Sequence, residues 1–354
     1  MDKKYELTRR FIVLENGVKL RRIKALKDFG DVRAGDIGGY VETRSNLDQS
    51  ENCWVYGNAK VYGNSRVHGN ARVFDDAQVY GNAEVYIYAR VFNNARVFDN
   101  AQVYDHARVF DDAQVYDHSQ VYDNAEVYNH AKIYNNSEVY DHAQVYDHAK
   151  VYGEAEVCGY AEVYGEAEVY DNGDICDDVK VYGSAKVYQG AEVYDHAKVY
   201  GDSEVCGYAE VYEGAEVYDY AQVFANAQVY GDAKIYGNAK IFGNILIKGD
   251  TQIKGYVKAK DNIKITTGVF AGNEIKHITI SKIGSRGDIT TFYVSDDNPD
   301  TILVSCGCFG GTITDFRKRV LNTHKKGSFY RYQYLEAIKY AKFAIGDGRG
   351  KYNV

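Results

Sequence analysis

One aliphatic side chain recurs at every sixth position over most of this chain. From Val55 to Ile265 each sixth residue is Val or Ile, except at Ala259, and no insertion interrupts the period. A small residue, usually Ala or Ser, stands two positions before the aliphatic one, and an aromatic residue, usually Tyr, follows it. Residues two apart in a strand share a face, so the aliphatic and small residues face inward, and the polar residue between them and the Tyr face outward. In an α-helix this period would scatter the aliphatic residues around the axis.

Three short strands that close a triangle satisfy this pattern, with six residues on each side and eighteen in each coil. Gly, Asp or Asn occupies most bends, where a left-handed backbone is often required. Neighbouring coils would bury each other's aliphatic side chains. We therefore predict a mainly β fold, a parallel hexapeptide β-solenoid of about 12 coils over residues 41–271, roughly 58 Å long at the usual strand spacing.

The two ends lack the period and are predicted to form separate parts. Residues 1–40 are predicted to form a β cap, with a hairpin over 11–26 that turns at Asn16 and Gly17. Residues 272–354 are predicted to form a small α+β domain. Thr312 or Thr314 is a candidate N-cap of its first helix. This domain is expected to contain strands over 277–284, 288–296 and 301–309 and helices over 312–324 and 333–345.

Composition limits the class of protein. No apolar run reaches the ~18 residues of a membrane span, and the N-terminus lacks the pattern of a signal peptide, so we expect a cytoplasmic protein. In that compartment the six cysteines are expected to be free thiols. Cys158 and Cys176 are one coil apart, a separation that a disulfide can span, so a bond between them stays open. Acidic residues outnumber basic ones in 41–271, whereas both ends are basic.

The segment from Leu20 to Asn64 carries features that the solenoid period does not explain. They are Asp28-Phe29, Asp31-Val32, Ala34-Gly35, Gly38-Gly39, Asn46-Leu47 and Cys53-Trp54-Val55-Tyr56. In these features the chain resembles YdcK-like hexapeptide-repeat proteins of bacteria and prophages, and its repeat is similar to that of left-handed β-helices. The resemblance implies a left-handed coil and a family known by its fold, sometimes described as a transferase. Residues 305–324 resemble a small prophage domain of unknown role.

Residues eighteen apart would stack in ladders along the solenoid, and three sets of charges are candidate binding residues. An acidic ladder would face a basic partner or cations. The alternative is that counter-ions and neighbouring Lys side chains balance its charge, and that it binds no partner. It consists of Glu138, Glu156, Asp174, Glu192 and Glu210. A second ladder opens with Arg72, Arg90 and Arg108. A basic cluster in the C-terminal domain is either a solvated helix face or a site for an anionic partner such as nucleic acid, and it consists of Arg317, Lys318, Arg319, Lys325 and Lys326.

The outward Tyr side chains form ladders of their own. The rings stack to cover the backbone, or they form a docking face, for example between the subunits of a homotrimer. The spacing of adjacent coils leaves no room for a base between two rings, and the acidic middle repels phosphates, so both features argue against nucleic acid on the solenoid.

Side chains at the bends include potential metal ligands. The weak candidates are His130, His148, Asp111 and Asp147. Asp and His are also ordinary turn residues, and we predict no metal site.

For the function, we predict a non-catalytic scaffold or binding protein, prophage-derived by its resemblance, that presents Tyr and acidic ladders to an unknown protein or small ligand. The alternative is a trimeric hexapeptide-repeat acyltransferase that uses acyl-CoA. The uninterrupted array sets no His apart as a general base, so no catalytic residue is predicted. No cofactor is expected, except acetyl-CoA under the alternative.

Overall fold

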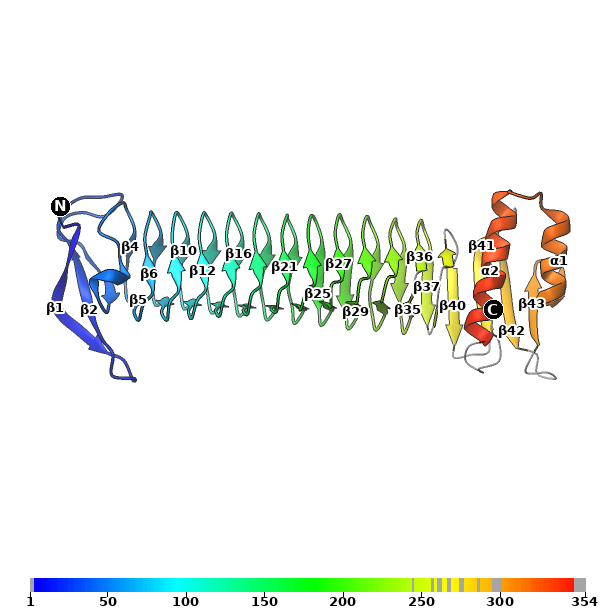
Figure 1. The fold of residues 1–354 in the computed structure, drawn as a ribbon, viewed down its shortest axis with the longest axis horizontal. Helices are drawn as coiled ribbons and strands as arrows, with labels where there is room; N and C mark the ends of the chain where they lie inside the picture. Colours follow the sequence, from blue (N-terminus) through cyan, green and yellow to red (C-terminus); the bar gives the residue numbers. More distant parts are fainter. Residues whose placement is uncertain are drawn as a thin grey trace. The chain divides into compact units, whose positions relative to one another are not determined.

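The computed structural model confirms a mainly β fold, a parallel β-solenoid of about 12 turns with a small C-terminal domain (Figure 1). It describes residues 3–243, 245–255, 258–259, 263–265, 269–273, 277–284, 287–294 and 301–346. The chain divides into two compact units, Met1–Gly183 and Ser184–Val354, which are described in turn.

The first unit begins with the predicted hairpin. Strand β1 (Tyr5–Val13) pairs with β2 (Lys19–Ala25) in antiparallel fashion, and Gly17 takes the left-handed conformation in the turn, with a φ of 83°. Strand β3 (Ile37–Val41) is antiparallel to β2 but parallel to β5 (Lys60–Val61), so it connects the cap to the first coil of the solenoid. A short 3-10 helix, η1 (Arg44–Asn46), follows.

Gly38 and Gly39 are explained by the close approach of this third strand to the first coil. A Cβ on Gly38 would lie 2.6 Å from the carbonyl oxygen of Val55, and one on Gly39 would lie 2.6 Å from that of Ala59. Real Cβ atoms do not approach backbone this closely, so only glycine allows β3 to enter the solenoid here.

The coils of the first unit form three faces, each a ladder of parallel strands in which every residue pairs with the residue eighteen positions on. The first face contains β5 (Lys60–Val61), β8 (Gln78–Val79), β11 (Arg96–Val97), β14 (Gln114–Val115), β17 (Lys132–Ile133), β20 (Lys150–Val151) and β23 (Glu168–Tyr170). The second face contains β6 (Arg66–Val67), β9 (Glu84–Val85), β12 (Gln102–Val103), β15 (Gln120–Val121), β18 (Glu138–Val139), β21 (Glu156–Val157) and β24 (Asp174–Ile175). The third face contains β4 (Trp54–Val55), β7 (Arg72–Val73), β10 (Arg90–Val91), β13 (Arg108–Val109), β16 (Glu126–Val127), β19 (Gln144–Val145), β22 (Glu162–Val163) and β25 (Lys180–Gly183).

The inward and outward assignments are confirmed. The repeating Val and Ala side chains are fully buried, whereas the polar residue between them is partly or fully exposed. Where Ser replaces Ala, its hydroxyl is satisfied by the backbone: Ser65 Oγ donates to the carbonyls of Tyr62 (2.7 Å) and Val79 (3.1 Å). The first residue of most bends is left-handed as predicted, for example Asp111 with a φ of 58°.

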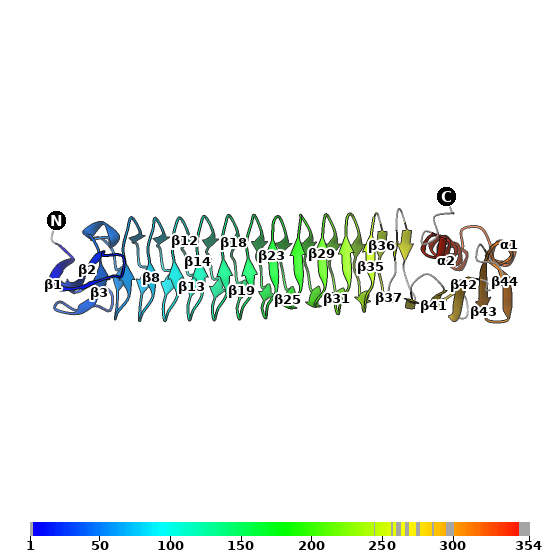
Figure 2. The ribbon, with the colours of Figure 1, turned by 90° about the horizontal axis from the view of Figure 1, so that it is seen from below.

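The second unit continues the same repeat in three further ladders (Figure 2). One contains β26 (Lys186–Tyr188), β29 (Glu204–Cys206), β32 (Gln222–Phe224), β35 (Lys240–Phe242) and β38 (Lys258–Ala259). Another contains β27 (Glu192–Val193), β30 (Glu210–Val211), β33 (Gln228–Val229), β36 (Ile245–Ile247) and β39 (Ile263–Ile265). The last contains β28 (Lys198–Gly201), β31 (Glu216–Val217), β34 (Lys234–Tyr236), β37 (Gln252–Gly255) and β40 (Val269–Asn273).

The C-terminal part of this unit begins at β40, which is parallel to β37 and antiparallel to the strand that follows it in the chain. The strands β41 (His277–Ile283), β42 (Asp288–Val294), β43 (Ile302–Cys306) and β44 (Phe309–Thr312) continue as antiparallel neighbours. The predicted third strand therefore ends earlier, at Cys306. The chain reverses there because Gly307 supplies a left-handed residue, with a φ of 56°.

The two predicted helices are present as α1 (Ile313–Thr323) and α2 (Phe329–Gly346). Thr312 is the N-cap of α1, since its hydroxyl accepts a hydrogen bond from the backbone N–H of Asp315 at 3.2 Å. Phe316 of α1 packs edge-on against Phe292 of β42 and Tyr334 of α2, and this aromatic contact joins the sheet to both helices. No helix in the described part of the chain is long and apolar enough to cross a membrane.

Candidate binding surfaces

The acidic ladder predicted from the sequence exists on the surface of both units. In the first unit Glu138 pairs in register with Glu156, and Glu156 with Asp174, on the second face. In the second unit Glu192 and Glu210 pair in the same way. Carboxylates on adjacent strands repel one another unless a neighbour stabilises the charge.

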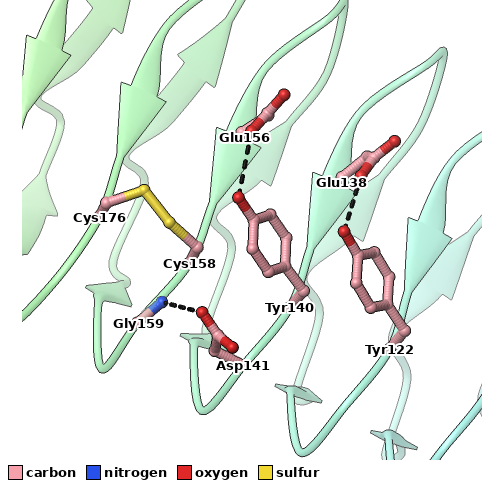
Figure 3. The surroundings of a disulfide bond; sticks show 8 residues. All are labelled: Tyr122, Glu138, Tyr140, Asp141, Glu156, Cys158, Gly159 and Cys176. Atoms are coloured by element: carbon pink, nitrogen blue, oxygen red, sulfur yellow. Dashed lines mark hydrogen bonds between the residues drawn. A yellow bond between two sulfur atoms is a disulfide. The ribbon is translucent and has the colours of Figure 1, made fainter.

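Tyr hydroxyls provide that stabilisation, which the sequence analysis missed. Tyr122 donates a hydrogen bond to Glu138 Oε2 at 2.8 Å, and Tyr140 donates to Glu156 Oε2 at 3.2 Å (Figure 3). In the second unit Tyr194 donates to Glu210 Oε2 at 3.4 Å. Each donor lies sixteen residues before its acceptor, so the bond runs diagonally from one coil to the next. The signal in the sequence was a Tyr followed sixteen positions later by a Glu, but the comparison of residues eighteen apart considers only equivalent positions of the repeat.

The electrostatics of these tyrosines keep them protonated donors. Burial against neighbouring rings, and then the Glu156 carboxylate, raise the pKa of Tyr140 to about 12. Burial, and then the hydrogen bond to the Glu138 carboxylate, raise the pKa of Tyr122 above its ordinary value. A phenol with a raised pKa remains neutral at physiological pH and continues to donate.

On the other two faces of the first unit, Glu162 and Glu168 accept the same kind of bond, from Tyr146 at 3.1 Å and Tyr152 at 3.2 Å, but they also have Lys partners. Lys150 pairs with Glu168 at 2.7 Å on the first face, and Lys180 pairs with Glu162 at 2.9 Å on the third. On the second face, no Lys or Arg in the described part of the chain forms an ion pair with Glu138 or Glu156. We call the row Tyr122, Glu138, Tyr140 and Glu156 the Tyr–Glu stripe.

The Tyr rings stack along the ladders as predicted. Tyr122 lies 5.0 Å from Tyr140 between ring centroids with an interplanar angle of 2°, and Tyr146 lies 4.9 Å from Tyr164. The rings are partly buried, and the contacts within the chain account for their stacking. Whether they also pack against other subunits stays a prediction.

The three arginines predicted as a ladder also stack on the third face, with Arg90 in register between Arg72 and Arg108. The two carboxylate oxygens of Asp31, in the cap, lie 3.2 and 3.1 Å from the two terminal nitrogens of Arg72. Arg108 pairs with Glu126 at 2.5 Å. The sequence could not show the contact with Asp31, because that residue belongs to the aperiodic cap.

The weak metal candidates at the bends have other partners. Asp111 accepts a hydrogen bond from the Asn93 amide at 2.7 Å, and Asp147 accepts one from Asn129 at 3.0 Å. The rings of His130 and His148 stack at 4.9 Å. Within the described ranges no group of three or more His, Cys, Asp or Glu residues is placed to hold a metal ion.

The expectation of free thiols is wrong for one pair of cysteines. Cys158 and Cys176 form a disulfide between adjacent coils, with their Cα atoms 4.6 Å apart (Figure 3). The reason is geometric, since the eighteen-residue step places both side chains in register at a distance that a disulfide spans. The remaining cysteines are free thiols.

The basic cluster of the second unit lies on α1 and the following turn. All five of its side chains are exposed, and they are Arg317, Lys318, Arg319, Lys325 and Lys326. Lys318 Nζ lies 3.7 Å from Asp315, and Arg319 lies over the ring of Phe309. The cluster is brought together as predicted, and a partner for it stays a prediction.

Comparison with known proteins agrees with this fold. The chain is 43% identical over 61 residues to the "Uncharacterized acetyltransferase YdcK" of Escherichia coli (strain K12), and this stretch covers 15% of the chain and only 19% of that relative's length. Residues 101–117 match the sequence model of a family described as "YdcK Beta solenoid repeat". The predicted resemblance is therefore confirmed: the chain is a β-solenoid that carries a YdcK-type repeat.

Proposed function

We propose that this chain is a non-catalytic binding solenoid whose Tyr–Glu stripe docks a basic segment of a protein partner. The observation that carries the proposal is the pair Glu138 and Glu156, which lie side by side and form no ion pair with a Lys or Arg among the described residues. On the first and third faces, Lys150 and Lys180 already neutralise such carboxylates.

A Lys- or Arg-rich segment fits the chemistry of the stripe. Glu156 is exposed and Glu138 is partly exposed, so both present oxygen atoms to solvent. A bound cation would reduce the repulsion between the two carboxylates. The tyrosine hydroxyls hold the carboxylates in place, so little side-chain entropy is lost on binding.

The test compares two double variants of the full chain. The probe is a fluorescently labelled peptide in which Lys alternates with Gly, and its binding is followed by anisotropy at low and high salt. We expect Glu138→Gln with Glu156→Gln to weaken binding by about tenfold. The matched control, Glu162→Gln with Glu168→Gln, removes carboxylates that already have Lys partners and should bind like the unmodified chain.

Two results would contradict the proposal. One is equal weakening by both double variants, which would mean that the peptide senses only net charge. The other is an affinity that does not fall with salt, since interactions between exposed charges are screened by ions.

A second candidate is an acyltransferase that uses acyl-CoA, because the E. coli relative is named an acetyltransferase. In this chain several of the array histidines that could act as a general base lie in stacked ring ladders, as His68 does with Tyr86 and His142 with Tyr160. Calorimetric titration with acetyl-CoA, together with light scattering, separates the two candidates. Saturable binding by a trimer would favour the acyltransferase, and its absence would favour the binding solenoid.

A further inference from the structure

The repeat is broken at one bend of the first unit. Most bends begin with Gly, Asp or Asn, but here Ile87 and Tyr88 occupy the two positions. Ile87 is left-handed, with a φ of 59°, and it is the only β-branched residue with a positive φ in the described part of the chain. A β-branched side chain is unfavourable in this conformation, and such strain is concentrated at functional sites. Tyr88, next to it, is 51% exposed.

Arg90 follows this bend and differs from the arginines above and below it. Arg72 and Arg108 are neutralised by Asp31 and Glu126. Arg90 is exposed, and within the described ranges no carboxylate forms an ion pair with it. The central guanidinium of the ladder therefore keeps its positive charge and its donors available to a ligand.

The space around Arg90 is hollowed. A depression of about 420 Å³ is lined by the three arginines together with Gly30, Asn52, Asn70, Tyr88 and His106. None of these lining residues is a carboxylate, whereas the two other described depressions on this unit contain Asp76 and Asp112. The depression that contains Lys60 and Arg96 balances them with Asp76 and Asp112, so among these three hollows only the one around Arg90 has positive charge in its lining without a carboxylate. Its size is within the range of small-molecule sites.

One wall of the hollow is aromatic. The Tyr88 ring stacks on His106 with centroids 5.0 Å apart and an interplanar angle of 10°. On the other side of Tyr88 the ladder continues with Asn70, whose amide oxygen accepts a hydrogen bond from Asn52 at 2.9 Å. The hollow thus combines a free guanidinium, amide groups and an exposed flat ring.

We propose that this hollow binds a small molecule that carries a phosphate or carboxylate group next to a ring. The oxyanion accepts two hydrogen bonds from the Arg90 guanidinium, whose planar fork matches either group. The ring of the ligand lies along Tyr88 and His106. The site lies on the third face and shares no residue with the Tyr–Glu stripe, so it extends the proposed function without depending on it.

Calorimetry on the full chain tests this inference with three probes: phenyl phosphate, benzoate and inorganic phosphate. We expect saturable binding of phenyl phosphate or benzoate, whichever group the site prefers, and weaker binding of inorganic phosphate. Arg90→Gln should weaken binding of the preferred probe by about tenfold. Arg90→Lys keeps the positive charge but loses the planar guanidinium fork, so its affinity should lie between those of the unmodified chain and Arg90→Gln.

Arg66→Gln is the matched control, because Arg66 is exposed at the same position of the repeat but lies outside the hollow. It should bind like the unmodified chain. The inference is overturned if none of the three probes binds, or if Arg90→Gln and Arg66→Gln bind the preferred probe equally. Melting temperatures of all variants check the fold, and peptide binding to the Tyr–Glu stripe should be unchanged in Arg90→Gln.

Discussion

In the N-terminal cap, Lys4 and Tyr5 are fully buried at positions that no other residue repeats, whereas in the coils of the first unit the interior consists almost entirely of Val and Ala. Lys4 donates to the carbonyls of Ser50 and Cys53, both at 3.0 Å. The coils need no such individual contacts, because each strand pairs with two copies of nearly the same strand. The cap therefore depends on single residues, while the coils depend on the register of the strands.

The largest effect is expected from a charge inside a coil. Val145→Asp places a carboxylate at a fully buried position without a partner. It should reduce the free energy of unfolding by about 5 kcal/mol. Chemical denaturation measures this loss. Gln144→Asp, one residue earlier and facing outward, is the control, and similar losses for both would refute the assignment of inward and outward faces.

A smaller but still large effect is expected where the cap enters the coils. Gly38→Ala brings a Cβ within 2.6 Å of both the Val55 carbonyl oxygen and the Ile23 side chain. Overpacking of this kind should cost about 3 kcal/mol. Gly310→Ala, which meets no atom within 4 Å, should leave the melting temperature unchanged. A stable Gly38→Ala variant would show that the cap can shift away from the first coil.

Next in size is the buried ammonium group of the cap. Lys4→Met removes the donor and leaves the carbonyls of Ser50 and Cys53 without it, for an expected loss of about 2 kcal/mol. Lys3→Met changes an exposed side chain and is the control. Limited proteolysis of the N-terminal segment, followed by mass spectrometry, should detect faster cleavage in Lys4→Met. Equal cleavage of both variants would contradict the role of Lys4.

In the coils, a single hydroxyl should matter less. Tyr122→Phe removes the hydrogen bond to Glu138 but keeps the stacked ring, so we expect a loss of about 1 kcal/mol. Tyr164→Phe is the control, because the residue sixteen positions on is Lys180, which offers no acceptor. Thermal denaturation of both variants measures the difference. An equal shift would mean that ring contacts, rather than the bond to the carboxylate, stabilise the Tyr–Glu stripe.

The smallest effect is a gain. Ile87→Asp restores the residue type that most bends of the repeat use in the left-handed conformation, and should raise the free energy of unfolding by about 0.5 kcal/mol. Asp99→Asn, at an ordinary bend, should be neutral. If Ile87→Asp is destabilising, Ile87 contributes contacts that outweigh its backbone strain.

The fold could be predicted from the sequence because its rules are local and repeated. A few neighbouring residues in the sequence are enough to predict the inward orientation of Val145, the left-handed bend at Asp111 and the N-cap at Thr312. All three predictions are confirmed. The binding surfaces could be predicted only in part. The acidic and arginine ladders follow from the eighteen-residue step, but the partner of Arg72 comes from the cap, which follows no period.

Two other features were missed for different reasons. The bond from Tyr140 to Glu156 runs diagonally between coils, so comparison of equivalent positions could not find it. The bond between Cys158 and Cys176 was within reach of the geometry, but an assumption about the redox compartment decided against it. The prophage origin and the cytoplasmic location stay predictions.

The constant pairing of each residue with the one eighteen positions on has a consequence for how such a gene can change in length. Loss or duplication of eighteen codons within the coils leaves every later strand paired with a strand at the equivalent position of the repeat. Loss of only six keeps the aliphatic lining intact but transfers each later side chain to the adjacent side of the triangle. Length in whole turns can therefore vary freely, while a change by a third of a turn would scramble the surface without disturbing the interior.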